Sequence, residues 1–151
     1  MNNVSFFLSK IAATVFFVGY IPFAPGTFGS LVGLLFVWLL RPDIYQLLII
    51  FIAGFFIGLL SSHIFEKDTG LKDNRKIVID EFVGYIASVL FLPLTIDYLF
   101  SAFVLFRLLD ILKPPPIRNV EMRLEGGLGV MVDDLIAGVF VNIILQVWTI
   151  I

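Results

Sequence analysis

The chain has 151 residues, of which 60% are hydrophobic and 15% charged, and its mean hydropathy is +1.05. Soluble domains are nearer ~45–50% apolar and ~25% charged, so the composition is typical of a membrane protein, and the length predicts one domain over 1–151. A net charge of −2 leaves no basic field that would gather nucleic acid, and the absence of cysteine together with a single histidine excludes thiolate chemistry, cysteine-ligated metals and mechanisms that need two histidines.

Six apolar stretches predict an all-α, integral membrane bundle of about six helices. The first, third and last reach the roughly 20 residues of a spanning helix, and the others are short enough to be tilted, re-entrant or buried against longer helices. The N-terminal sequence lacks the basic region and cleavage site of a secretory signal, so we expect the first stretch to be retained. The stretches are 4–21, 28–40, 44–65, 82–96, 97–112 and 128–151.

The charged residues are concentrated in two segments, with nine in 66–81 and nine in 107–134. If all six stretches cross the bilayer, the connections at 21–28, 66–80 and 113–127 lie on one side, and those at 41–43 and 93–97 lie on the other. The first side carries most of the Lys and Arg residues. The positive-inside rule therefore predicts that the motif loops gather at the cytoplasmic face of the inner membrane.

The first polar feature in chain order is a Pro-Gly turn at 22–30. We predict Thr27 as the N-cap of the next helix, and the free N–H groups over 27–30 would form an anion site. Simple capping is the commoner role of such a turn, so Thr27 and Ser30 become candidate phosphate ligands only if a phosphate is argued independently. Further along, His63 is read as a structural residue, with proton transfer as the alternative.

Two pairs of adjacent carboxylates follow. Asp80 and Glu81 open a predicted helix, where one acid could complement the helix dipole while its neighbour points about 100° away around the helix. Asp133 and Asp134 lie within the last apolar stretch, where an ionised Asp costs on the order of 2.5–3.5 kcal/mol. We therefore expect a compensating partner for these acids.

A mixed cluster of charges precedes the last stretch. Arg107 and Asp110 are three residues apart and share a helix face, which Lys113 continues. The prolines at 114–116 end the helix and hold an extended segment that would present Arg118 at the membrane surface. The alternative is an internal ion pair with two anchoring cations.

Five carboxylates at one end of the apolar hairpins would repel one another in a low dielectric, and a hard divalent cation would relieve the repulsion. Mg²⁺ takes oxygen ligands and keeps substrate phosphate among them, while Arg and Lys hold phosphate oxygens. The pattern predicts metal-assisted phosphoryl transfer or hydrolysis on a lipid headgroup. The carboxylates are Asp80, Glu81, Asp110, Asp133 and Asp134, and the candidate phosphate ligands are Thr27, Ser30, Arg107, Lys113 and Arg118.

Four motifs, in order along nearly the whole chain, resemble those of the phosphatidylglycerophosphatase A family. The resemblance implies a magnesium-dependent membrane enzyme that removes the terminal phosphate of phosphatidylglycerophosphate, releasing phosphatidylglycerol and inorganic phosphate. It also implies that Asp80, Glu81, Asp133 and Asp134 bind the metal or activate water, with Asp110 close behind. The motifs are Pro25-Gly26-Thr27 with Gly29-Ser30; Ile79-Asp80-Glu81-Phe82; Phe106-Arg107-Leu108-Leu109-Asp110 with Lys113-Pro114 and Pro116-Ile117-Arg118; and Gly126-Gly127-Leu128-Gly129 with Asp133-Asp134 and Ala137-Gly138.

Two other functions stay open at this point. A small ion or proton transporter could use Asp133 and Asp134 as its pathway, and a metal-dependent phosphatidyltransferase could share the metal chemistry. Within the phosphatase reading, attack by water and a phospho-aspartyl intermediate are both compatible with the residues. The sequence gives no expectation about the number of metal ions or the oligomeric state.

Overall fold

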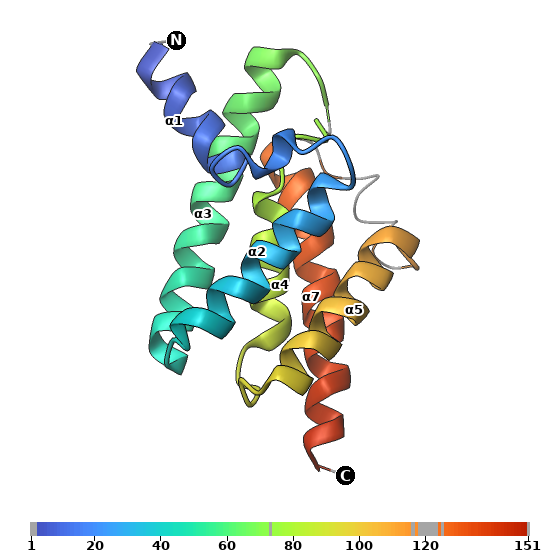
Figure 1. The fold of residues 1–151 in the computed structure, drawn as a ribbon. Coiled ribbons are helices and arrows are strands. Elements are labelled where there is room, and N and C mark those ends of the chain that lie inside the picture. Colours follow the sequence, from blue (N-terminus) through green and yellow to red (C-terminus); the bar gives the residue numbers. More distant parts are fainter. Residues whose placement is uncertain (1–2, 73, 116, 118–123, 125, 151) are drawn as a thin grey trace.

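A computed structural model describes residues 3–72, 74–115, 117, 124 and 126–150. This part of the chain is entirely helical and contains no strand, which confirms the predicted fold class (Figure 1). The short α4 lies at the centre and packs against four other helices. The helices are α1 (Asn3–Ala13), α2 (Pro25–Leu40), α3 (Ile44–Thr69), α4 (Ile79–Val89), α5 (Ile96–Leu112) and α7 (Gly126–Ile150), with a 3-10 turn, η1 (Val18–Tyr20).

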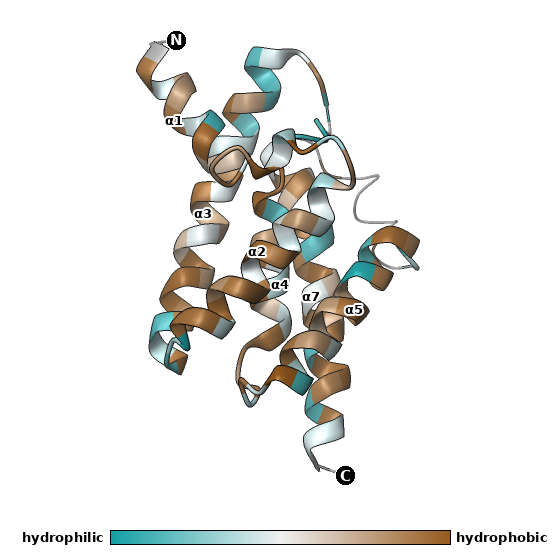
Figure 2. Ribbon diagram, in the orientation of Figure 1, coloured by the Kyte–Doolittle hydropathy of each residue, from teal (hydrophilic) through white to brown (hydrophobic). Residues whose placement is uncertain are grey.

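Two helices are long and apolar enough to cross a membrane: α3, with 26 residues, and α7, over the 24 residues Gly126–Thr149. Large apolar side chains are exposed along α3, among them Ile52 and Phe56, which are 52% and 59% exposed. Figure 2 shows that hydrophobic residues predominate along the lower parts of α2 and α3 and along most of α5. An apolar surface of this extent is typical of contact with lipid and agrees with the predicted membrane bundle.

The prediction that the first apolar stretch, 4–21, is long enough to span a membrane is wrong. Helix α1 ends at Ala13, and Val15, Phe16 and Phe17 all have positive φ angles, which turn the chain back. The carbonyl oxygen of Ala13 instead accepts a hydrogen bond from Val78 N–H at 2.9 Å. Pairing with the segment before α4 therefore replaces continuation of the helix.

The connections sort to the two ends of the bundle as predicted. Residues 14–24, 70–72, 74–78 and 113–115 lie at one end, which we call the site end, and residues 41–43 and 90–95 lie at the other (Figure 1). Local sequence sets both ends of α3: Asp43 and Gln46 form a capping box at its start, and Gly70, with φ +67°, is the C-cap after Thr69.

Glycines allow α4 to approach its neighbours closely. A Cβ at Gly29 of α2 would lie 2.8 Å from the carbonyl oxygen of Val78, and one at Gly138 of α7 would lie 2.3 Å from that of Gly84. The Gly29 contact agrees with helix packing by small residues. At the far end of α4, Asn142 donates to the carbonyls of Ser88 and Leu90, at 3.2 and 2.7 Å, and so satisfies a helix terminus.

Candidate active site

A cavity of about 310 Å³ opens at the site end of the bundle. It lies where α2 and α4 begin, where α5 ends and beside the first turns of α7, so four helices contribute to it. Its lining combines anions, cations and a few small or apolar residues. The lining residues are Ala24, Pro25, Gly26, Asn74, Arg75, Ile77, Asp80, Glu81, Arg107, Asp110, Ile111, Lys113, Val130, Asp133 and Asp134.

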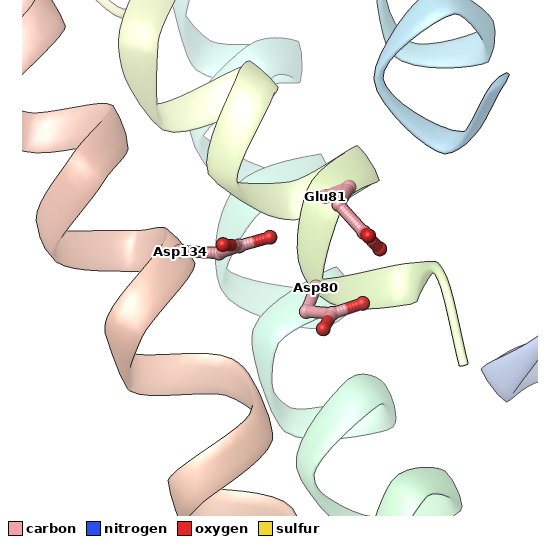
Figure 3. Close-up of side chains that lie close together, drawn as sticks. All are labelled: Asp80, Glu81 and Asp134. Atoms are coloured by element: carbon pink, nitrogen blue, oxygen red, sulfur yellow. The ribbon is translucent and has the colours of Figure 1, made fainter. Parts of the chain in front are cut away.

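Three carboxylates converge in this cavity. Asp80 and Glu81 belong to the first turn of α4, and Asp134 reaches them from α7 (Figure 3). One oxygen from each carboxylate lies within 4.8 Å of the other two. Because the first turn of a helix favours negative charge, α4 stabilises two of these acids in place, whereas Asp134 depends on the packing of α7 against α4.

The cluster has unfulfilled bonding capacity. Asp80 Oδ1, Glu81 Oε2 and Asp134 Oδ2 are buried and accept no hydrogen bond from the described residues. A buried acceptor without a partner costs about 1–3 kcal/mol, and more when it is charged. Each of the same three residues also has an oxygen within 4.8 Å of the other two, and such a set of oxygens fits the ligand preference of Mg²⁺.

Burial also raises the pKa of the two acids of the cluster that belong to α4, Asp80 and Glu81. Burial raises the pKa of Asp80 to about 6. Burial, followed by the neighbouring Asp80 charge, raises the pKa of Glu81 well above its usual range. Both shifts reflect the cost of burying a carboxylate charge close to other carboxylates.

Arg107 connects the cavity to α2. Its Nη1 donates to Asp110 Oδ2 in an ion pair within α5 and lies 3.5 Å from Ser30 Oγ. Ser30 is fully buried and donates to the carbonyl oxygen of Gly26 at 3.0 Å. Arg107 Nε is buried and has no hydrogen-bond partner among the described residues. Arg107 is therefore held in position while retaining a donor for a ligand.

Lys113 faces the acids from the end of α5. Its Nζ donates to Asp133 Oδ2 at 2.7 Å, and the Asp133 side chain is 8% exposed. Asp133 thus lies against a cation, outside the three-carboxylate group that could hold a metal ion. Its assignment as a metal ligand stays a prediction, and the geometry gives it a second role in positioning Lys113.

Most of the predicted site residues line one cavity, as Asp80, Glu81, Asp110, Asp133, Asp134, Arg107 and Lys113 do. The predicted N-cap is wrong: α2 begins at Pro25 with Ala24 as N-cap, and the N–H of Thr27 donates to Ala24 O at 2.9 Å. Thr27 is absent from the lining residues, and Ser30 reaches the site through Arg107. Arg118 lies outside the described residues.

Sequence reasoning missed Gly26 as a site residue. A Cβ at this position would lie 1.9 Å from Glu81 Oε1 and 3.3 Å from Arg107 Nη1, so only glycine leaves room for both side chains. The Pro-Gly pair at the start of α2 was the available signal. Asn74 and Arg75 also line the cavity, whereas His63 packs near Gly126 and is absent from the lining.

The fold and the site define an all-helical membrane protein with a buried acidic cluster beside two cations. The model of the phosphatidylglycerophosphatase A family matches residues 11–149, which is most of the chain. The chain therefore belongs to the phosphatidylglycerophosphatase A family.

Three relatives show how far the similarity extends. The chain is 40% identical to phosphatidylglycerophosphatase A of Escherichia coli, over 85% of this chain and 76% of the relative. It is 40% identical to the Haemophilus influenzae protein of the same name, over 91% and 88%. A putative phosphatidylinositol-3-phosphatase of Bacteroides thetaiotaomicron is 34% identical over 93% of both chains. No solved structure matches the chain.

Proposed function

We propose that this protein hydrolyses the terminal phosphate monoester of phosphatidylglycerophosphate, giving phosphatidylglycerol and inorganic phosphate. The observation that carries the proposal is the cavity in which three carboxylates with unpaired oxygens face Arg107 and Lys113. Its dimensions and charges suit a phosphate monoester, and the names of two relatives supply the lipid. The enzyme is accordingly a phosphoric monoester hydrolase of phospholipid metabolism.

Asp80, Glu81 and Asp134 are the residues that would hold Mg²⁺, because their oxygens are close together and lack other partners. The bound ion would supply Lewis-acid polarisation of the phosphoryl group and lower the pKa of water. These three residues are also the ones whose charge repulsion the ion would relieve. Their position on α4 and α7 makes binding of the ion dependent on the contact between these two helices.

Arg107 and Lys113 bind the phosphate oxygens and neutralise charge that develops during transfer. Asp110 and Asp133 act through these cations, since each carboxylate accepts a hydrogen bond from one of them. A terminal monoester carries more negative charge than a bridging diester, so two adjacent cations favour the monoester. Selection of the terminal phosphate then follows from charge.

A carboxylate of the cluster orients the attacking water and accepts its proton. The water oxygen bonds to phosphorus, the bond between phosphorus and the glycerol oxygen breaks, and that oxygen takes up a proton to become the hydroxyl of phosphatidylglycerol. Acid quenching of the enzyme during turnover of substrate that carries ³²P in its terminal phosphate tests this pathway. Label in released phosphate alone is expected, and label in a protein aspartate would indicate a phospho-aspartyl intermediate instead.

The location follows from the distribution of charge. We place the protein in the inner membrane as a multi-pass protein with the site end in the cytoplasm, because Lys67, Lys72, Arg75 and Lys76 all belong to the site end. The phosphate of a lipid in the cytoplasmic leaflet would then meet the cavity at the membrane surface.

The test is phosphate release from phosphatidylglycerophosphate by purified protein in detergent, with and without Mg²⁺. The control is Asp68→Asn, which changes an exposed acid in the last turn of α3, at the site end of the bundle. Both the wild-type protein and this control are expected to release phosphate only with Mg²⁺. Asp80→Asn is expected to abolish release. No release by folded wild-type protein would contradict the proposal and favour a transporter or a phosphatidyltransferase.

Substrate choice needs a second comparison, because one relative carries a phosphoinositide in its name. Phosphatidylinositol 3-phosphate presents a monoester on a bulkier ring than glycerol phosphate does. Faster release from phosphatidylglycerophosphate in a direct competition is the expected result. A preference for the phosphoinositide would keep the reaction class and change the substrate.

A further inference from the structure

A groove of about 560 Å³ runs between α5 and α7, toward the end of the bundle opposite the polar cavity. Aromatic and aliphatic side chains dominate it, and Asp97, in the first turn of α5, is its one charged residue among the described residues that line it. The lining residues are Asp97, Tyr98, Phe100, Ser101, Val104, Leu105, Ile144, Leu145 and Trp148. A groove of this composition suits an aliphatic ligand.

An exposed apolar stripe on α5 joins this groove to the polar cavity. Phe100 and Val104 line the groove, Ile111 lines the polar cavity, and Leu108 lies between them. Their spacing of four, four and three residues places them on one helix face. All four are exposed, at 59%, 40%, 49% and 68% for Phe100, Val104, Leu108 and Ile111. The groove and the polar cavity thus share a continuous apolar path on the protein surface.

The length of this path matches a lipid tail. Phe100 and Ile111 are eleven residues apart on α5, which is about 16 Å along a helix. Half of the ~30 Å hydrocarbon core of a bilayer is about 15 Å, which is the depth that the tails of one leaflet fill. A lipid with its phosphate in the polar cavity would therefore have a tail long enough to follow the stripe into the groove.

We infer that the groove between α5 and α7 holds an acyl chain of the lipid whose phosphate lies in the polar cavity. The inference rests on the proposed function and deepens it, since it makes the tail of the substrate, as well as its phosphate, part of what the protein recognises. The same two helices supply Arg107 and Asp134 at one end and the apolar groove at the other. A single lipid can thus contact both sites without crossing to another face of the bundle.

The first test fills the groove and varies the tail. Val104→Trp is expected to lower kcat/KM for dipalmitoyl phosphatidylglycerophosphate by about tenfold while leaving the dihexanoyl substrate, whose tails end before the groove, nearly unchanged. The matched control is Ile52→Trp, which introduces the same large side chain in place of an exposed aliphatic residue on α3. This control is expected to leave both substrates unaffected.

Each contrary outcome has a separate meaning. Equal effects of Val104→Trp on both substrates, or no effect on either, would overturn the groove assignment while wild-type turnover still supported the phosphatase. A wild-type protein inactive on both substrates would contradict the proposed function itself. A loss with Ile52→Trp that matches the loss with Val104→Trp would indicate general contact with surrounding lipid.

A second test uses fluorescence and needs no variant that fills the groove. Trp38 and Trp148 are the two tryptophans of the chain, and only Trp148 lines the groove. In Trp38→Phe, phosphatidylglycerophosphate with brominated tails, added in plain detergent without Mg²⁺, is expected to quench Trp148 at concentrations where it leaves Trp38 of Trp148→Phe unquenched. Equal quenching of both tryptophans would show unselective lipid contact and overturn the inference.

Discussion

The five acids of the site divide into two kinds by what their oxygens contact. Asp110 and Asp133 each accept a hydrogen bond from a cation, whereas Asp80, Glu81 and Asp134 present buried oxygens without one. A carboxylate that already neutralises an Arg or Lys has less to offer a metal ion than one that does not. Substitutions in the two groups should therefore have different consequences.

Asp134→Asn tests the unpaired group. We expect it to lower activity by on the order of a hundredfold or more, because it removes one of the three proposed metal ligands. Without metal, however, thermal unfolding should shift to higher temperature, because a neutral amide replaces a buried charge that has no partner. Differential scanning fluorimetry with and without Mg²⁺ checks this, and lower stability in both conditions would count against the assignment.

Asp133→Asn tests the paired group. Loss of the carboxylate removes the acceptor that Lys113 Nζ contacts at 2.7 Å, so binding of the phosphate should weaken more than the chemical step. We expect KM to rise by about tenfold with a smaller change in kcat. Steady-state kinetics at saturating Mg²⁺ measure the split, and a much larger fall in kcat than rise in KM would assign Asp133 to the metal or to water activation.

Sequence reasoning located this site well because the site consists mainly of charged residues, which are conspicuous in an apolar chain. A carboxylate in an apolar helix requires a partner, and seven predicted residues line one cavity. The division between paired and unpaired acids could not be predicted, since it depends on how α5 and α7 pack. Gly26 was missed for the same reason: its role is the space it leaves for Glu81, which only the fold defines.

At the level of elements, the contact between α4 and α7 determines the site, because it brings Asp134 to Asp80 and Glu81. The glycines of this contact leave almost no space: a Cβ at Gly84 would lie 2.8 Å from the carbonyl oxygen of Asp134 itself. Small residues at this interface therefore control the separation of the carboxylates as well as the packing of the helices.

Gly138→Val should separate these helices. Its side chain would meet the Gly84 carbonyl, so we expect a loss of about 1–3 kcal/mol in unfolding free energy and weaker binding of Mg²⁺. Gly54→Ala is the control, since a Cβ there meets only a side-chain methyl of Val83 at 3.0 Å. Unfolding in detergent monitored by circular dichroism provides the comparison, and equal stability of both variants would contradict this account.

Hydropathy predicted the long helices correctly and failed at the first stretch. The pattern over 44–65 and 128–151 corresponds to α3 and α7, whose length and composition are local properties. The stretch 4–21 is also apolar, but Val15, Phe16 and Phe17 adopt left-handed backbone angles that no propensity favours for them. Contacts with the segment before α4 compensate for this conformation, and such contacts are not visible in a hydropathy profile.

On the scale of the whole molecule, the bundle has a polar end and an apolar body, and orientation in the membrane can be measured directly. The chain contains no cysteine, so a single introduced thiol is an unambiguous marker. Asp68→Cys reports on the site end and Thr95→Cys on the opposite end. A membrane-impermeant maleimide added to spheroplasts should label Thr95→Cys, and it should label Asp68→Cys only after lysis. The reverse pattern would place the site outside the cytoplasm.

The order of the helices along the chain also constrains how the protein is made. The acids of α4 leave the ribosome well before α7, which brings Asp134 and the packing surface that encloses them. During synthesis, Asp80 and Glu81 must therefore remain at the membrane surface, or within the insertion machinery, until α7 packs against α4. The nascent chain has no enclosed cavity in this interval, so we expect activity to require that α7 has packed against α4.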